Sequence, residues 1–208
     1  MVQIQVPSNV PHLQEDMTIE QLINWLAKYG QTNAGGVTRL LYSPSWLQAQ
    51  KALKEKMATI GLQPYFDSVG NLFGRALGTV RAEKVILTGS HIDTVIQGGK
   101  YDGAYGIVAS LLAVKRLIER YGSPKYTIEV VSLCEEEGSR FPLTYWGSKN
   151  VMGQYDASAI SSLKDKNDVS FIDAMGEAGF PLSHYQSSKR KDVQHFVEVH
   201  IEQGQVLE

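Results

Sequence analysis

Lys84-Val-Ile-Leu-Thr-Gly-Ser90 is a compact run of mostly apolar residues, which is typical of a buried β-strand. A glycine-containing loop over residues 91–101 follows it. Apolar residues then recur at helical spacing over residues 106–121. Tyr126-Thr-Ile-Glu-Val-Val-Ser-Leu133 is a second strand pattern. This order of strand, loop, helix and strand predicts a βαβ unit, and therefore an α/β fold built on a central sheet.

Weaker patterns predict the elements on either side of this unit. Thr18 and Gln21 have the spacing of a helix capping box, and Ser43-Pro44 is a favourable start for a second helix. The expected elements are helices over 18–29, 43–60, 158–164 and 170–178, a strand pair over 64–67 and 71–77, and an alternating strand from Phe196 to Glu202. Residues 1–16 are polar and contain two prolines, so we expect a loosely ordered N-terminal arm.

Composition restricts the class of protein. The chain has 208 residues, which is enough for one sizeable domain. A net charge of −2 does not suggest a polyanion-binding surface, so nucleic acid is not an expected partner. The single cysteine, Cys134, cannot form a disulfide within the chain and fits a reducing compartment. Residues 1–16 do not resemble a signal peptide and no apolar run is long enough to span a membrane, so we expect a cytoplasmic location without membrane association.

The connection between the first strand and the helix carries candidate metal ligands in two segments. His91 and Asp93 are one residue apart, so in an extended segment both side chains would project to the same side. Asp93 could then orient a metal-binding His91. Asp102 lies between a glycine-rich loop and the predicted helix, and its two oxygens could bridge two cations. Taken alone, an exposed His–Asp pair and a helix-capping Asp are the commoner interpretations.

Two further segments add carboxylates and a second histidine. Cys134-Glu-Glu-Glu-Gly138 follows the second strand directly, at the end of the strand where open α/β sheets place their sites. Adjacent carboxylates can divide the work, since one can bind a metal ion while its neighbour takes a proton from water. His200 lies on the polar face of the last predicted strand, with Glu198 and Glu202. Alone, a solvated acidic run and a half-exposed strand histidine are the commoner interpretations.

Four segments in this order resemble the signature blocks of the dinuclear metallo-amidohydrolases, a family that includes allantoate amidohydrolase, N-carbamoyl-L-amino-acid hydrolase and β-ureidopropionase. The segments are Gly-Ser-His91-Ile-Asp93-Thr, Asp102-Gly, Glu135-Glu-Glu-Gly-Ser-Arg-Phe141 and Val-His200-Ile-Glu-Gln-Gly204. Order and spacing match over roughly residues 20–208. The resemblance implies a three-layer α/β/α metallopeptidase-like catalytic domain with a mixed central sheet. It also implies metal-dependent hydrolysis of a ureido or carbamoyl C–N bond.

The resemblance implies a ligand set for two divalent metal ions, Mn²⁺ or Zn²⁺, both of which suit His and carboxylate donors. Its members are the first-metal ligands His91 and His200, the bridging Asp102 and the second-metal ligand Glu137. Glu136 would be the general base that takes a proton from water and returns it to the leaving nitrogen. Asp93 would orient His91. Gln203 would contact the substrate.

The family pattern extends beyond this sequence. In the family, a lid and dimerisation domain is inserted in the middle of the chain, and a further metal-binding histidine lies far downstream. The resemblance therefore implies that residues 17–208 are the N-terminal portion of a catalytic domain, incomplete in this chain and inactive alone. It implies a homodimer for the whole protein and a small ureido compound as substrate. His184 and His195 match no block and are expected at the surface.

Three alternatives stay open at this point. Within the family, Phe141–Asn150 is more similar to the allantoate enzymes than to the carbamoylases, although core packing is the favoured interpretation of Tyr145 and Trp146. N-carbamoyl-L-amino-acid hydrolase and β-ureidopropionase are therefore alternatives to allantoate amidohydrolase. Cys134 beside Glu135 would also fit a thiol amidase. Outside the enzymes, the chain could be an inactive remnant or an interaction partner.

Overall fold

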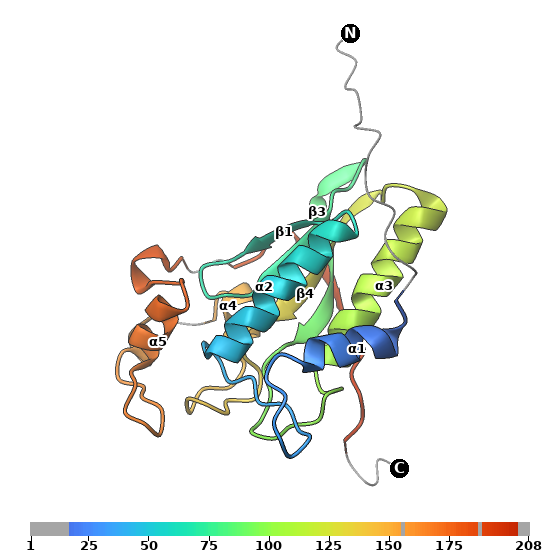
Figure 1. Ribbon diagram of the computed structural model, residues 1–208. Helices are drawn as coiled ribbons and strands as arrows, with labels where there is room; N and C mark the ends of the chain where they lie inside the picture. The colour runs from blue at the N-terminus through green and yellow to red at the C-terminus, as the bar shows by residue number, and fades with distance from the viewer. Residues whose placement is uncertain (1–16, 155–156, 187–188, 204–208) are drawn as a thin grey trace.

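The computed structural model describes residues 17–154, 157–186 and 189–203, so the predicted N-terminal arm lies outside the described residues. A five-stranded mixed sheet forms the centre, and the long helices lie in front of it in Figure 1. The strands are β1 (Gln63–Phe66), β2 (Leu72–Ala76), β3 (Arg81–His91), β4 (Tyr126–Leu133) and β5 (Val193–Val197). The helices are α1 (Ile19–Ala27), α2 (Pro44–Thr59), α3 (Ala104–Tyr121), α4 (Trp146–Val151) and α5 (Phe171–Glu177), with 3-10 turns η1 (Ala157–Ile160) and η2 (Leu182–His184). The prediction of an α/β fold with a mixed central sheet is confirmed.

The βαβ unit predicted from the sequence is the centre of this sheet. Strands β3 and β4 are parallel neighbours, and α3 connects them across one face. The sheet order is β1-β2-β4-β3-β5, with β5 parallel to β3 and with β1 and β2 antiparallel at the other edge. Three adjacent strands, β4, β3 and β5, therefore run in one direction and end at the same edge of the sheet.

The first two helices begin where their sequences predict. Thr18 caps α1, and the side chains of Thr18 and Gln21 complete the predicted capping box. Ser43 caps α2 and Pro44 occupies its first turn. The buried side of α2 includes Leu53 and Met57 as predicted, whereas Leu47 lies only at the margin of the core.

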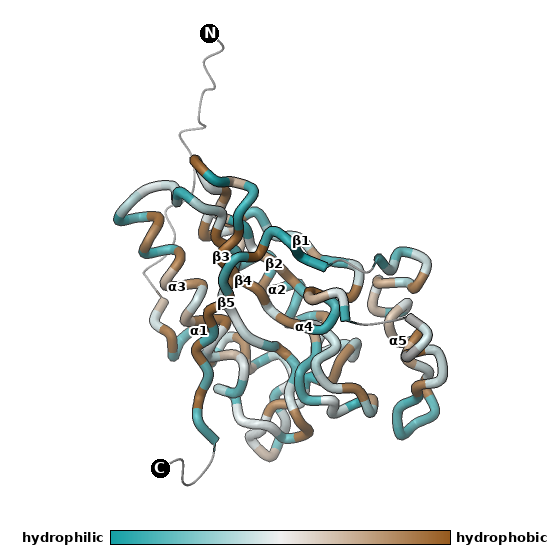
Figure 2. Tube along the Cα trace, turned by 180° about the vertical axis from the view of Figure 1, so that it is seen from behind, coloured by the Kyte–Doolittle hydropathy of each residue, from teal (hydrophilic) through white to brown (hydrophobic). Residues whose placement is uncertain are grey.

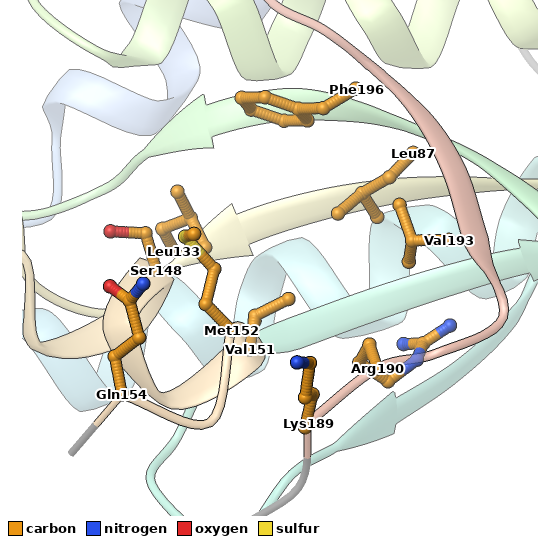
Figure 3. Close-up of a pocket in the computed structure, with 10 residues that line it drawn as sticks. All are labelled: Leu87, Leu133, Ser148, Val151, Met152, Gln154, Lys189, Arg190, Val193 and Phe196. Atoms are coloured by element: carbon orange, nitrogen blue, oxygen red, sulfur yellow. The ribbon is translucent and has the colours of Figure 1, made fainter.

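The main hydrophobic core lies between the helices and one face of the sheet. It includes side chains of α1, α2, α3, α4 and α5, together with Val130 of β4. Seen from behind in Figure 2, the opposite face carries the segment that leads into β5. That face has a smaller cluster around Phe73, Leu87 and Val131. It also has a hollow of about 360 Å³, whose lining residues are drawn in Figure 3. Helix α4 lies at the margin of the two faces, since Trp146 packs in the main core and Val151 packs against the smaller cluster.

Two local predictions were wrong at the C-terminal side. Residues 158–164 were expected to form a helix, but η1 covers Ala157–Ile160 and no α-helix follows within 161–164. The last strand was expected over Phe196–Glu202, but β5 covers Val193–Val197 and its ladder with β3 ends at Thr88 and Val197. Alternation of apolar and polar residues cannot show where a neighbouring strand stops offering partners, so the predicted strand was displaced toward the C-terminus.

The elements missed by the sequence analysis are short. They are α4 and η2, which contain six and three residues. The strand pair over 64–67 and 71–77 and the helix over 170–178 are confirmed as β1, β2 and α5, each within two residues of its predicted bounds. Among the described residues, no helix combines the length and apolar character needed to cross a lipid bilayer.

Candidate metal centre

The carboxyl ends of the three parallel strands bring the candidate residues together. His91 is the last residue of β3, and Glu136 and Glu137 follow the end of β4 after a short interval. His200 lies beyond the end of β5, and Asp102 immediately precedes the glycine that caps α3. The site therefore lies outside the carboxyl ends of parallel strands, which is the general location of ligand sites in open α/β sheets.

His91, Asp102 and His200 form the first set of donors. The Nε2 atoms of the two histidines are 3.3 Å apart. The Oδ1 atom of Asp102 lies 3.6 Å from Nε2 of His91 and 3.4 Å from Nε2 of His200. Their Nδ1 atoms face backbone carbonyls instead, since Nδ1 of His91 lies 3.0 Å from the carbonyl of Asp93, and Nδ1 of His200 lies 2.9 Å from the carbonyl of Ile201. Both Nε2 atoms are thus directed at the same carboxylate oxygen.

This spacing fits a shared divalent cation. Two ligands that bind one tetrahedral ion at bond lengths of about 2.1 Å lie about 3.4 Å from each other. The three separations, 3.3, 3.4 and 3.6 Å, are close to that value. A Nδ1–H that donates to a carbonyl also leaves Nε2 as the lone-pair nitrogen, which is the tautomer that binds a metal ion. The donors present therefore fit the metal that the sequence analysis expected.

Glu136 and Glu137 form a second set with His91. One ligand atom from each of these three residues lies within 4.8 Å of the others. A hydrogen bond joins the side chains of Glu137 and Asp102, so the two sets meet at Asp102. Asp102 has two oxygens, and a carboxylate in this position can contact two cations.

The electrostatic environment favours positive charge at this edge. Burial alone lowers the pKa of His91, but the carboxylates of Asp102 and Asp93 outweigh burial and raise it well above the usual histidine value. The imidazole of His91, followed by a hydrogen bond from Gln203, holds the pKa of Asp102 below its usual range. The field that favours a proton on this imidazole also favours a divalent cation.

The two glutamates are harder to ionise than ordinary surface carboxylates. Burial is the main cause for both, and it raises the pKa of Glu136. Burial and the hydrogen bond with Asp102 raise the pKa of Glu137 to about 7. A carboxyl group whose pKa is shifted toward neutrality is suited to proton transfer near neutral pH.

Asp93 contacts residues of both donor sets. Its Oδ1 accepts a hydrogen bond from the backbone N–H of Glu136, and its Oδ2 accepts one from that of Glu137, each at 3.0 Å. Its Oδ1 also lies 3.4 Å from Nδ1 of His91. Sequence spacing suggested that Asp93 orients His91, and the contact is compatible with that role. The two bonds to the glutamate backbone could not be read from spacing.

Glu135 is a buried residue for which the sequence predicted no role at the metal centre. Its Oε1 accepts a hydrogen bond of 2.7 Å from the N–H of Gly138, and its side chain also hydrogen-bonds Asp93. Burial, together with the negative charge of Asp93, raises the pKa of Glu135 to about 10. Three consecutive glutamates gave no indication that the first one faces inward.

Gly103 allows α3 to approach the site closely. Its φ is +59°, and a Cβ atom at this position would collide with the carbonyl and the ring of His91. A glycine accepts this left-handed conformation readily and leaves the required space. A glycine at position 103 is therefore needed for α3 to lie this close to His91.

The remaining predicted residues have varied placements. Gln203 is exposed, and its side chain hydrogen-bonds Asp102. Trp146 is buried, as core packing predicts, but Tyr145 is 48% exposed, so the packing interpretation is wrong for Tyr145. Its φ is +61°, and its N–H donates to the carbonyl of Glu136 at 3.2 Å. His184 and His195 are exposed, as predicted.

Cys134 does not have the environment of a nucleophile. The residue is completely buried, and burial raises the pKa of its thiol well above the usual value. Its backbone N–H donates to Asn71, and its carbonyl accepts from the indole of Trp46, each at 2.9 Å. Cys134 therefore holds the start of the glutamate segment in place, and the geometry disfavours the thiol amidase interpretation.

Taken together, these contacts define an α/β protein with a candidate metal centre of histidine and carboxylate side chains at the carboxyl edge of its parallel strands. The model of the family described as Peptidase family M20/M25/M40 matches residues 87–208, and the chain belongs to this family. The matched range includes every donor described above.

Individual relatives agree with this assignment. The allantoate amidohydrolase of Bacillus subtilis (strain 168) is 56% identical over 92% of this chain and 46% of its own length. The allantoate amidohydrolase of Escherichia coli (strain K12) is 50% identical over 91% of this chain and 46% of its own length. A crystal structure of a hydantoinase/carbamoylase family amidase from Burkholderia ambifaria has a TM-score of 0.79 at 28% identity, and the match covers 89% of this chain and 45% of that one. The chain thus spans about half the length of the curated relatives it matches.

Proposed function

We propose that this chain supplies the metal-binding part of an amidohydrolase that cuts the ureido C–N bond of allantoate and releases ammonia and carbon dioxide. The observation that carries the proposal is the convergence of two histidines and three carboxylates at one edge of the sheet. They are His91, His200, Asp102, Glu136 and Glu137. The 56% and 50% identity to two allantoate amidohydrolases supports the choice of substrate.

We assign each donor the role that its position supports. His91 and His200 would hold one divalent ion, Asp102 would contact two, and Glu137 would hold the second. When bound, the ions would polarise the scissile carbonyl and acidify water. Mn²⁺ and Zn²⁺ both suit this donor set, which contains no thiolate.

Glu136 is the general base in this proposal. Its carboxyl group lies beside His91 and is partly exposed, so water can reach it. Its raised pKa lets it take a proton from the attacking water and deliver the proton to the leaving nitrogen. Asp93 orients His91 and the backbone of Glu136, whereas Gln203 is the proposed substrate contact at the exposed side.

A hybrid enzyme tests catalysis directly. This chain would replace the matching part of the Bacillus subtilis allantoate amidohydrolase, and ammonia release from allantoate would be measured with Mn²⁺. We expect turnover by the hybrid, and Glu136→Gln should lower kcat by about 10²–10⁴-fold while the metal content stays the same. Glu119→Gln, on the exposed side of α3, is the matched control and should leave kcat unchanged. Substantial turnover by the Glu136→Gln hybrid would reject the base assignment.

An N-carbamoyl-L-amino acid is the second candidate substrate, because the similar Burkholderia structure is described as a hydantoinase/carbamoylase family amidase. The same hybrid should prefer allantoate over N-carbamoyl-L-amino acids in kcat/KM, and the reverse preference would favour the second candidate. We also propose that the whole protein is a cytoplasmic homodimer. The single cysteine supports the compartment, and the family resemblance supports the dimer.

A further inference from the structure

Arg39 is a charged residue with no exposed surface. It lies in the loop between α1 and α2, and none of its surface reaches solvent. A buried guanidinium loses its hydration, so it is retained where several acceptors compensate it. Arg39 belongs to none of the four segments that carry the candidate ligands, and the mechanism proposed above does not use it.

Its hydrogen bonds hold both neighbours of Asp93. The Nε of Arg39 donates to the carbonyl of Ile92 at 2.9 Å. Its backbone N–H donates to Oγ1 of Thr94 at 2.9 Å, and the N–H of Thr94 donates back to the carbonyl of Arg39 at 3.2 Å. The side chain of Arg39 therefore holds Ile92, and the backbone of Arg39 holds Thr94.

The other end of the guanidinium holds α1. Its NH1 donates to the carbonyls of Leu26 and Tyr29, each at 3.3 Å, at the C-terminal end of that helix. A cation at this end is favourable because helix carbonyls point toward it. Among the described residues NH2 has no hydrogen-bond partner, but the charge is attracted to Asp93.

Asp93 extends this connection to the metal centre. It contacts His91 on one side and accepts the backbone N–H groups of Glu136 and Glu137 on the other. A displacement of the Ile92–Thr94 segment would therefore move donors from two different loops at once. Outer contacts of this kind influence metal affinity because they fix the orientation of the ligands.

We propose that Arg39 is a positioning residue of the metal centre. It fixes Ile92 and Thr94 against the end of α1, and thereby holds Asp93, His91 and the backbone of the two glutamates in their observed positions. The inference rests on the proposed metal centre. It assigns Arg39 no contact with a metal ion or substrate. A purely structural arginine would change stability, whereas a positioning arginine also changes metal affinity in the folded protein.

The first test compares Mn²⁺ binding by the full 208-residue chain with and without the substitution Arg39→Met, measured by titration calorimetry. We expect affinity about 10- to 100-fold weaker than that of the unchanged chain. Leu53→Ala is the matched control, because Leu53 is fully buried in α2 and its truncation also destabilises the fold. The control should keep the affinity of the unchanged chain for each folded molecule.

Amide hydrogen exchange without added metal is the second readout. In Arg39→Met, the N–H groups of Glu136 and Glu137 should exchange faster relative to those of the β4 interior, whereas Leu53→Ala should affect both groups equally. Arg39→Lys covers the case in which Arg39→Met does not fold. It keeps the buried charge, but its single nitrogen cannot bond the carbonyls of Ile92, Leu26 and Tyr29 together, so it should weaken Mn²⁺ binding in the same direction.

The outcomes separate this inference from the proposed function. Mn²⁺ binding by the unchanged chain, together with equal affinity and equal exchange in folded Arg39→Met, would overturn the role of Arg39 alone. If Arg39→Met does not fold, unchanged affinity in Arg39→Lys would overturn it in the same way. A folded, unchanged chain that binds neither Mn²⁺ nor Zn²⁺ would overturn the metal centre and the inference together. Weaker binding in the variants with normal binding in Leu53→Ala would support both.

Discussion

Glu137 is the proposed ligand at which protons and a cation would compete most evenly near neutral pH. Burial and its hydrogen bond with Asp102 raise its pKa to about 7, so the metal-free side chain holds a proton below that pH. His91 is protonated over a wider range, because the surrounding carboxylates raise its pKa well above the usual value. The metal ions proposed to bind these two residues must displace these protons.

Metal affinity should therefore rise with pH, and more steeply below about pH 7 than above it. Binding displaces the proton of His91 throughout this range, and below about pH 7 it also displaces the proton of Glu137. Mn²⁺ titrations at several pH values between about 5.5 and 8.5 measure the slope. Glu137→Gln should weaken binding and reduce the change of slope near pH 7. An unchanged bend in the variant would show that another group causes it.

Asp102 should matter for both ions, since it faces both histidines and hydrogen-bonds Glu137. We expect Asp102→Ala to lose both bound ions, because it removes the charge that the two donor sets share. Metal stoichiometry after gel filtration measures the effect. Asp173→Ala, at an exposed position of α5, is the control and should retain the metal content of the unchanged chain. Retention of both ions by Asp102→Ala would contradict the bridging role.

At the scale of elements, helices and strands were predicted correctly where the local sequence pattern alone determines them. The strand ending at Leu133 and the capping residues Thr18 and Ser43 follow from local chemistry alone. The end of β5 depends on where β3 stops offering partners, so alternation misplaced it. The contacts of Arg39 depend on a loop that folds back onto β3, and no local pattern encodes such contacts.

The same distinction applies to the candidate site. Four separated segments were predicted to meet, and they do meet, because parallel strands place their carboxyl ends at one edge. The roles of the five donors and of Asp93 and Gln203 stay predictions. Glu135 and Tyr145 show the limit of the approach, since burial of one and exposure of the other depend on how the loop after β4 turns.

The two ends of α3 offer a matched test of its placement. Gly103 and Gly122 flank the helix, and both have positive φ values, +59° and +76°. A Cβ atom at Gly122 would have no atom within 4 Å, whereas one at Gly103 would strike His91. Alanine is strained at both positions, by about 1–3 kcal/mol, because the ψ values of −43° at Gly103 and −161° at Gly122 combine with positive φ. The close contact with His91 is an additional cost at Gly103 only.

We expect Gly103→Ala to lower both the free energy of unfolding and the Mn²⁺ affinity, because either α3 or His91 must shift. Gly122→Ala should show the strain cost alone and bind Mn²⁺ normally. Urea unfolding and Mn²⁺ titration of the two variants measure the effects. Equal metal affinity in the two variants would mean that the N-terminus of α3 can move away from the site without displacing His91.

At the scale of the whole molecule, a buried ionic cluster connects segments that are distant in the sequence. We name it the Glu129 clasp, and its members are Tyr65, Arg75, Glu129 and Arg190. Glu129 is completely buried on β4 and accepts hydrogen bonds from Arg75 of β2 at 2.6 Å and from Arg190 at 2.8 Å. Arg190 lies at the lower edge of the hollow in Figure 3, just before β5. The clasp therefore joins β1, β2 and β4 to the segment from which β5 and His200 continue.

Breaking the clasp should cost more than breaking an ion pair at the surface. Arg190→Met removes one of two cations from a carboxylate that has no access to water, and Arg75 remains to compensate the charge in part. We expect a loss of about 2–3 kcal/mol in the free energy of unfolding, below the usual cost of leaving a buried charge unpaired. Urea unfolding with an unchanged m-value would measure it.

Lys164→Met is the comparison, because it breaks the ion pair with Asp168, where the two side chains are 57% and 89% exposed. Exposed pairs contribute about 0.2–1 kcal/mol, so the loss should be several times smaller. If both variants lost the same small amount, water would have to reach Glu129 in solution. The segment before β5 would then be held by the β3 ladder and by the bond from the Arg190 N–H to the carbonyl of Val151, and the clasp would contribute little to the placement of His200.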